Sequence, residues 1–365
     1  MQRAIELGII QEKEYANCIK RGYIGLLSKV RINKDDGLID LCDANNGLGI
    51  QKNYDAYVTR PRKRNGQEVI SSFLWATTIV ENKKDRISYV KPSPCETFVC
   101  TDYSQGKVFV FEKGEKVWEH DAPLSNDIWV LDNGNLLFTK GNGVLEVTRN
   151  NDTIFQYTSQ SHVFACQRLT NGNTFVGECE SGRLLEVDSN GKIVKDLSIL
   201  PLGTTNGKKS FMRNARKLEN GHYLVAHYGG KRVVEYDENG NIYWEVPVSG
   251  GAHSVIRLPN GNTLVAVTDM DKNPRIVEFN SDKNIVWEFS NKDIEGAPLK
   301  FLSGMQYIPG MGIVFTNWTG HVKEKVPYIY WVDWNKNIID TFGPCADIES
   351  VSSVFIPLKN EKVYH

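Results

Sequence analysis

One turn recurs along most of the chain and limits what it can fold into. An Asn-Gly dipeptide joins two apolar strands in four segments: Ile128–Phe138, Cys166–Val176, Arg216–Val225 and Val255–Val265. A second hairpin with alternating apolar residues occurs six times: Lys107–His120, Gly143–Tyr157, Gly182–Asp196, Lys231–Glu245, Pro274–Glu288 and Pro327–Thr341. Asn-Gly supplies the positive φ angles that tight hairpins require. The pattern therefore predicts repeated antiparallel units of four strands.

Four-stranded units repeated every 40–50 residues or so are typical of a β-propeller, because a single blade cannot bury both of its faces. Residues 97–126 supply only three strands, and the strand at 354–358 has no hairpin partner. We expect this last strand to become the innermost strand of the first blade. The predicted fold is mainly β, a six-bladed β-propeller over residues 91–365 with non-covalent strand closure.

Composition excludes several classes of function. Lys+Arg 43 against Asp+Glu 44 gives a net charge of −1, so no basic surplus favours a nucleic-acid partner. No run of 18 apolar residues predicts a membrane span. The seven cysteines show no CxxC spacing, and the first residues lack the pattern of a secretory signal. From this chain alone we expect a cytoplasmic protein.

Residues 1–90 have a different period. Apolar residues recur there at helical spacing, which predicts helices over about 12–30 and 67–81. Three motifs stand in order: G-L-L-S-K-V at 25–30, D-G-L at 36–38, and F-L-W-A at 73–76 followed by Glu81.

Residues 10–85 with these motifs resemble the last two helices of the unsaturated glucuronyl and rhamnogalacturonyl hydrolases, glycoside hydrolase families 88 and 105. The resemblance implies a short α-helical segment, the partial end of an α/α toroid, and a role in processing uronic-acid glycans. That family's catalytic aspartate lies upstream of anything present here. The chain is then either a fragment that lacks an N-terminal toroid domain, periplasmic or secreted, or a propeller with a helical cap. An unrelated helical hairpin is the alternative.

The blades resemble pyrroloquinoline-quinone-like and arylsulfotransferase-like repeats. No tryptophan-docking motif recurs in every blade, so we predict no quinone. Five oxygen-bearing residues on one face would suit Ca²⁺: Asn126, Asp127, Glu178, Asn214 and Asp269. They form no self-contained binding motif, and we therefore predict neither a metal nor another cofactor.

Strand order divides a propeller into two faces. The turn face carries the Asn-Gly turns that follow the innermost strands, and we expect little chemistry there. The funnel face, where the chain enters the innermost strands, collects the reactive residues. Our catalytic candidates are His253, His162 and His227, and our substrate-binding candidates are Arg213, Asn214, Glu178, Tyr228, Trp318, Asn126 and Asp127.

Each candidate also has a purely structural interpretation. His227 follows an apolar strand and is explained equally well by a hydrogen bond within the blades. Arg213 should point toward the axis, where an unpaired guanidinium is costly. It therefore needs Glu178 or Glu180 as a partner, or an anionic ligand.

These observations favour a saccharide-active propeller of glycan degradation that binds or cleaves an anionic, uronate-containing oligo- or polysaccharide at the central funnel. If it cleaves, the class is a glycoside hydrolase or polysaccharide lyase, with a histidine as acid or base. The alternative is a non-catalytic interaction propeller that binds a protein or glycan partner on the same face.

Overall fold

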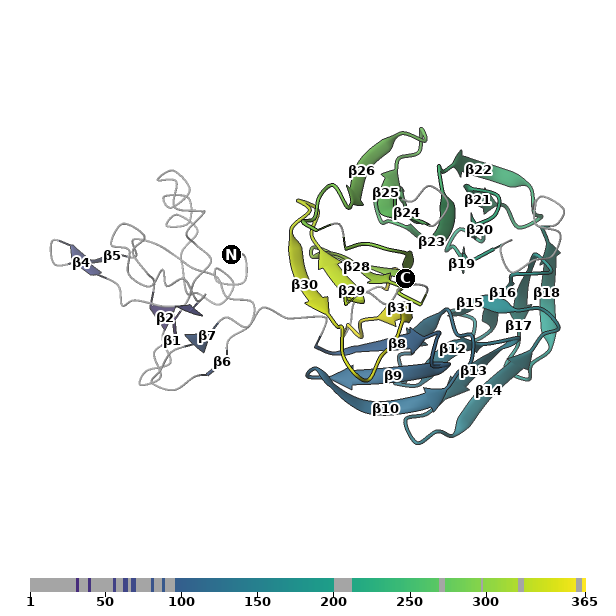
Figure 1. Ribbon diagram of the computed structural model, residues 1–365, viewed down its shortest axis with the longest axis horizontal. Helices are drawn as coiled ribbons and strands as arrows, with labels where there is room; N and C mark the ends of the chain where they lie inside the picture. Colours follow the sequence, from purple (N-terminus) through teal and green to yellow (C-terminus); the bar gives the residue numbers. More distant parts are fainter. Residues whose placement is uncertain are drawn as a thin grey trace. The chain divides into compact units, whose positions relative to one another are not determined.

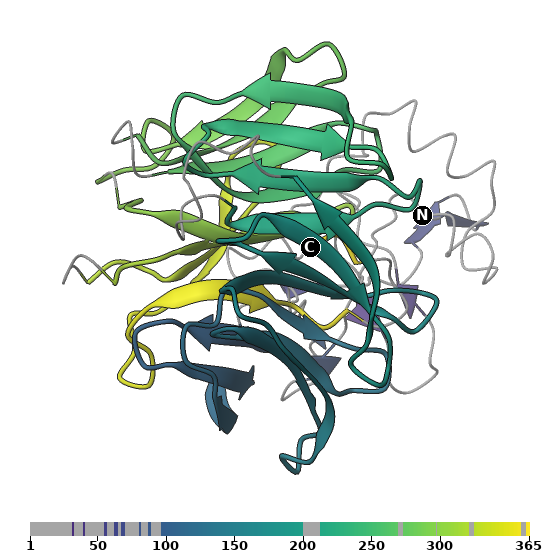
Figure 2. The same ribbon diagram turned by 90° about the vertical axis from the view of Figure 1, so that its right-hand side faces the viewer.

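The computed structural model describes residues 96–199, 212–268, 273–296, 298–320, 325–358 and 363–365, and the backbone of seven short strands before residue 90. The chain divides into two compact units, Met1–Pro92 and Ser93–His365. They are drawn in Figure 1, and again after a 90° turn in Figure 2.

The described residues of the first unit are all strands. These are β1 Arg31–Ile32, β2 Ile39–Asp40, β3 Asp55–Ala56, β4 Arg62–Arg64, β5 Gln67–Val69, β6 Val80–Glu81 and β7 Ile87–Ser88. The helix expected over 67–81 is therefore wrong at both of its ends, where β5 and β6 lie. The register Arg64↔Gln67 spans Asn65-Gly66, a hairpin dipeptide that outweighs the helical spacing. The helix expected over 12–30 lies outside the described residues, and the described part of the chain contains no helix to support a toroid end.

The second unit is a six-bladed propeller, as the repeats predict. Blades 1 to 3 contain β8 Phe98–Asp102, β9 Lys107–Glu112, β10 Glu115–Asp121; β11 Ile128–Val130, β12 Leu136–Lys140, β13 Gly143–Val147, β14 Thr153–Thr158; and β15 Val163–Arg168, β16 Thr174–Glu178, β17 Arg183–Val187, β18 Ile193–Ser198. Blades 4 to 6 contain β19 Asn214–Lys217, β20 Tyr223–His227, β21 Arg232–Tyr236, β22 Ile242–Pro247; β23 Gly251–Arg257, β24 Thr263–Thr268, β25 Arg275–Phe279, β26 Ile285–Ser290; and β27 Leu302–Ile308, β28 Gly312–Asn317, β29 Ile329–Val332, β30 Ile338–Phe342.

The ring closes without a covalent link, through strand pairing and apolar packing of the last strand. The last strand, β31 Val351–Phe355, pairs with β8 and gives blade 1 the order β10-β9-β8-β31. Thr101 of β8 and Ser352 of β31 share a hydroxyl hydrogen bond of 2.7 Å across 251 positions of sequence. The predicted non-covalent closure is confirmed, and the end of the chain lies near the centre of the ring (Figure 1).

The core consists of six hydrophobic clusters in the described residues, one between each pair of neighbouring blades. The two inner strands of each blade are almost wholly buried, whereas the outermost strands alternate or are exposed. This gradient explains the sequence pattern, because only the central strands have a blade packed on both faces.

Three ion pairs join four successive blades, blades 2 to 5, near the turn face. The pairs are Glu146–Arg168 at 2.6 Å, Glu186–Lys217 at 3.0 Å and Glu235–Arg257 at 2.5 Å. Each joins the third strand of one blade to the innermost strand of the next, with a carboxylate that is at least seven-eighths buried. We call these three pairs the interblade ladder.

Candidate functional site

A small pocket opens on the funnel face at the end of the axis. Its lining residues come from five of the six blades or from the loops between them: Tyr103, Asn126, Arg213, Tyr228, His253, Phe301, Ser303, Trp318 and Ser352. Its volume is about 190 Å³, enough for one ring-sized group rather than a drug-sized molecule. We call it the aromatic pocket.

Ring contacts form a continuous arc around this pocket. Tyr228 stacks on Phe301 with 6.5 Å between ring centroids, and Phe301 meets Trp318 edge-on at 5.1 Å. Trp318 in turn contacts Tyr103 at 6.2 Å. Blades far apart in sequence therefore share one apolar wall.

Two glycines make room for these rings. A Cβ atom on Gly251 would lie 2.4 Å from the ring of Tyr228, and one on Gly320 would lie 2.3 Å from the ring of Trp318. Real Cβ atoms do not approach that closely, so any larger residue forces the ring to move. The positions of these two rings in the wall of the pocket therefore depend on glycine at both sites.

Arg213 lies between two rings, with its guanidinium carbon 4.9 Å from the ring centroids of both Phe164 and Tyr228. Its Nε atom is buried without a hydrogen-bond partner among the described residues. Stacking favours a cation but leaves its in-plane N–H groups without acceptors. The pocket therefore contains a positive charge whose donors are available to a ligand.

Neither carboxylate considered as a partner for Arg213 is paired with it. Glu178 is 1 % exposed and accepts hydrogen bonds from four other groups: Tyr157, Ser159, Ser181 and Arg183. Glu180 instead lies 3.2 Å from Nδ1 of His162. Of the alternatives set out for Arg213, an anionic ligand remains.

His253 is the candidate histidine that lines the aromatic pocket. It meets Phe301 edge-on at 5.2 Å and Tyr228 at 6.1 Å. Burial, and secondarily the charge of Arg213, lower the pKa of His253 to about 3. Its imidazole is therefore neutral at physiological pH and can donate one hydrogen bond and accept another.

The other two candidate histidines lie outside the pocket lining. His162 pairs with Glu180 beside Phe164. His227 is 1 % exposed, and its Nε2 shares a 2.8 Å hydrogen bond with the hydroxyl of Tyr236. Burial lowers the pKa of His227 to about 3. Its surroundings match the structural interpretation.

The remaining candidates lie along the axis at different depths. Asn126 and the ring of Trp318 line the aromatic pocket, whereas Asn214 lines a narrow neck below it with Arg213 and His253. Asp127 lies deeper, 1 % exposed, and binds both terminal nitrogens of Arg216 at 2.7 and 2.9 Å. Burial disfavours the charge of Asp127, but Arg216 and His365 outweigh it and keep its pKa below the ordinary value.

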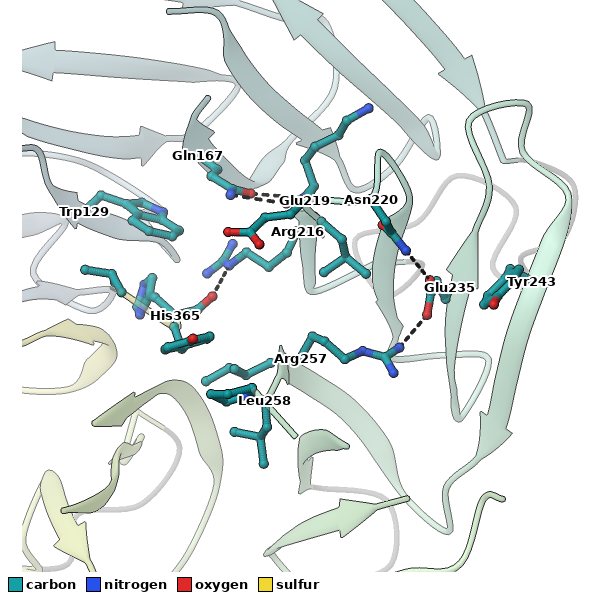
Figure 3. A pocket seen from close by; sticks show the side chains of 16 residues that line it. Trp129, Gln167, Arg216, Glu219, Asn220, Glu235, Tyr243, Arg257, Leu258 and His365 are labelled. Atoms are coloured by element: carbon teal, nitrogen blue, oxygen red, sulfur yellow. Dashed lines mark hydrogen bonds and ion pairs between the residues drawn. The ribbon is translucent and has the colours of Figure 1, made fainter. Parts of the chain in front are cut away.

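The turn face, on which we expected little chemistry, also carries buried and charged side chains. A pocket of about 530 Å³ lies there, and Figure 3 shows its charged lining, with Arg216 beside His365 and Arg257 beside Glu235. We call it the turn-face pocket. Asn220 of an Asn-Gly turn lines it, and Arg216 and Arg257 come from the innermost strands β19 and β23, whereas Glu235 comes from β21.

Sequence reasoning also missed several residues of the aromatic pocket. Phe301 and Ser352 precede or lie at the start of innermost strands, and Phe164, which covers Arg213 without lining the pocket, lies at the start of one in blade 3. The register count that selected Arg213 and His253 would have found Phe301 and Phe164, had apolar residues been considered. Within the part of the chain that the structure describes, no three His, Cys, Asp or Glu side chains are placed to hold a metal ion. The described residues also contain no helix that is long and apolar enough to cross a membrane.

Comparison with known proteins gives a partial match. The family model for arylsulfotransferase matches residues 164–295, which span blades 3 to 5 and include Arg213, Tyr228 and His253. The predicted likeness of the blades to that repeat is confirmed over this stretch. No curated protein matches the chain.

Solved structures share the fold at low identity. A protein of unknown function from Bacteroides caccae is 23% identical with a TM-score of 0.63, over 70% of this chain and 97% of that one. Virginiamycin B lyase from Staphylococcus aureus is 16% identical with a TM-score of 0.47, over 70% of this chain and 86% of that one. The first likeness shows the propeller fold alone.

Proposed function

We propose that the aromatic pocket binds the anionic end of a glycan, a uronate residue, and that the protein is a saccharide-active propeller of glycan degradation. The observation that carries the proposal is Arg213. Its guanidinium is stacked between two rings, its Nε has no partner among the described residues, and both carboxylates considered for it are occupied elsewhere. A ligand carboxylate would satisfy its fork of N–H donors.

The rest of the lining suits a single sugar ring. The apolar faces of a sugar pack on aromatic side chains, which the arc from Tyr228 to Trp318 offers. Asn126, Ser303 and Ser352 supply amide and hydroxyl groups for the ring hydroxyls. The volume of about 190 Å³ fits one such ring beside Arg213.

Binding is better supported than cleavage. A general base works best when its pKa lies near the operating pH, and the pKa of His253 is about 3 in the unliganded protein. Of the two cleavage classes, a polysaccharide lyase fits the lining better, because Arg213 would neutralise the carboxylate beside the proton to be removed. His253 would take that proton, a C=C double bond would form as the glycosidic C–O bond breaks, and the departing oxygen would take a proton from water.

A second candidate ligand is an aryl sulfate. The family whose model matches residues 164–295 is named for arylsulfate chemistry, and that stretch supplies three residues of the aromatic pocket. A sulfate would face Arg213, and the aryl ring would lie against the aromatic arc.

Calorimetric titration separates these ligands. The panel contains a glucuronate-terminated oligosaccharide, its glucose-terminated counterpart and 4-nitrophenyl sulfate. We expect the glucuronate compound to bind best and to lose roughly 2–4 kcal/mol in Arg213→Ala. Arg183→Ala is the matched control, because Arg183 lies near the funnel face but pairs with Glu178 and Asp196.

Equal affinity of wild type and Arg213→Ala for the glucuronate compound would exclude the proposed site. Preference for the aryl sulfate, lost in Arg213→Ala, would support the second candidate instead. Ultraviolet absorbance of an unsaturated product, developing with time, would add lyase activity to binding.

A further inference from the structure

The segment 363–365 lies in the turn-face pocket as a bound peptide would. The carbonyl oxygen of Tyr364 accepts a 2.9 Å hydrogen bond from the backbone N–H of Tyr307 in β27. Arg216 donates from Nε to the carbonyl oxygen of His365 at 2.6 Å, as Figure 3 shows. His365 is 4 % exposed, and Tyr364 pairs with Tyr307 in an isolated β-bridge, with 5.5 Å between their ring centroids.

The imidazole of His365 fits a receptor built from several blades. Its Nε2 lies 3.2 Å from Oδ1 of Asp127 and must donate there, because a carboxylate only accepts. Its ring meets Trp129 edge-on at 4.9 Å and Phe355 at 5.4 Å. One carboxylate and two aromatic walls thus select an imidazole.

The receptor is held together without the segment. Arg216 binds Asp127 through both terminal nitrogens and stacks over Trp129, 5.3 Å from its ring centroid. The backbone N–H of Cys166 donates to Asp127 at 2.9 Å, and Trp129 donates from Nε1 to the carbonyl oxygen of Cys166 at 2.6 Å. We call Asp127, Trp129 and Arg216 the axial hub.

The pocket is larger than its occupant. About 530 Å³ lies beside residues 363–365, with Leu218, Leu258 and Tyr243 as apolar lining and the Arg257–Glu235 pair as a polar wall (Figure 3). Mixed apolar and hydrogen-bonding surface of this kind suits a peptide strand better than a strongly charged ligand.

We propose that the axial hub is a peptide-binding site selective for a histidine side chain, and that residues 363–365 occupy it as an exchangeable ligand. Residues 363–365 belong to no strand of a blade, so they can open locally without unpairing one. His365 also lines the neck that leads to Arg213 and His253. Its release would join the turn-face pocket to the aromatic pocket along the axis.

The test adds a labelled peptide to the full chain. The peptide is Glu-Lys-Val-Tyr-His, the sequence of residues 361–365, amidated and carrying a fluorophore at its amino end. In the wild type the chain's own segment competes at high effective concentration, so the added peptide binds weakly. In His365→Ala this competitor is weakened, and we expect the peptide to bind roughly tenfold more tightly.

The matched control peptide ends in Ala instead of His, and we expect it to bind neither protein. Circular dichroism melting verifies that His365→Ala is folded, and His365→Asn replaces it if it is not.

Tighter binding of the histidine peptide to the variant supports the proposal. Absence of peptide binding to both proteins, equal affinity for both, or equal binding of the two peptides would show that the segment is only structural. None of these outcomes depends on a ligand in the aromatic pocket.

Discussion

At the scale of single residues, the aromatic pocket depends on a glycine that leaves room for an aromatic ring. The ring of Tyr228 occupies the space that a Cβ of Gly251 would take, and the same ring covers Arg213. A glycine that is buried and contacts no ligand is therefore part of the wall that orients the cation.

Gly251→Ala tests this arrangement. The new methyl group would lie 2.4 Å from the ring of Tyr228, so the ring must move off Arg213. We expect affinity for the glucuronate compound to fall roughly tenfold, because a stacking contact of about 1 kcal/mol or more is lost. In a Tyr228→Ala background the same change should have no further effect on calorimetric affinity. Additive losses would contradict the mechanism.

His253 gives a prediction about pH. Its pKa of about 3 means that its imidazole is uncharged between about pH 6 and 8. A bound carboxylate raises that pKa but must raise it by several units before proton uptake is measurable in this range. We therefore expect the affinity for glucuronate to stay within about twofold from pH 8 to pH 6. A steep rise in affinity on acidification through pH 7 would show that His253 titrates near neutrality.

At the scale of elements, the blades are tied by polar contacts as well as by the core. In the interblade ladder, Glu235 also binds His222 at 2.7 Å, so it is fully engaged on two sides. Trp244 and Trp287, at the same register in β22 and β26, each donate from Nε1 to a carbonyl of the following blade. Blades 4 and 5 thus each have a tryptophan that contacts the following blade, although the motif does not recur in every blade.

Breaking one ion pair of the interblade ladder should lower the free energy of unfolding more than breaking an ion pair on the surface. We expect Arg257→Met to lower the free energy of unfolding by about 2 kcal/mol, since it leaves the buried Glu235 without its cation. Arg149→Met, which removes an exposed pair with Glu112, should cost between about 0 and 1 kcal/mol. Urea titration of both variants measures the difference. Equal losses would mean that the ladder adds nothing to stability.

Closure of the ring can be tested separately from the segment in the axial hub. Deleting residues 350–365 removes β31 and leaves β8 as an unpaired inner edge. We expect the melting temperature to fall by roughly 10 °C or more. Replacing only Val363, Tyr364 and His365 by alanine keeps β31, and should lower it less. Equal melting of the deletion variant and the full chain would refute closure by β31.

Local sequence patterns predicted the blades because each hairpin is specified by its own turn and its own alternation. They also placed Arg213 and His253 at one end of the axis, because equivalent register positions in a ring must converge. They missed the axial hub, since Asp127 meets residues 89 and 238 positions away in the sequence. A local sequence period cannot predict contacts between residues so far apart in the chain. In the first unit, helical spacing misled because it ignored the hairpin dipeptide at Asn65-Gly66.

At the scale of the whole molecule, buried histidines set the response to acid. Burial lowers the pKa of His227 and His253 to about 3, and also lowers the pKa of His365. In the unfolded chain these groups titrate near 6.5. Below about pH 6.5 these histidines take up protons in the unfolded state but not in the folded state. The free energy of unfolding therefore decreases as pH falls from about 6.5 toward 3. Above about pH 6.5 the three histidines contribute no pH dependence.

The expected slope is up to about 1.4 kcal/mol per pH unit for each such histidine. Denaturant titrations between about pH 7.5 and 4.5 measure it. His227→Gln should flatten the curve by the share of one histidine, because glutamine has no proton to gain. Parallel curves for variant and wild type would mean that His227 is protonated in the folded protein.

The partner of β8 has a consequence for synthesis. Thr101 leaves the ribosome 251 residues before Ser352, with which it shares a hydrogen bond. At roughly 5–20 residues per second, that interval lasts about 13–50 s. Blades 2 to 5 can all form during this time, while blade 1 remains a sheet of three strands with an open edge. The nascent chain therefore exposes the unpaired edge of β8 early and covers it last. Translation rate and chaperone binding then influence how this ring is assembled.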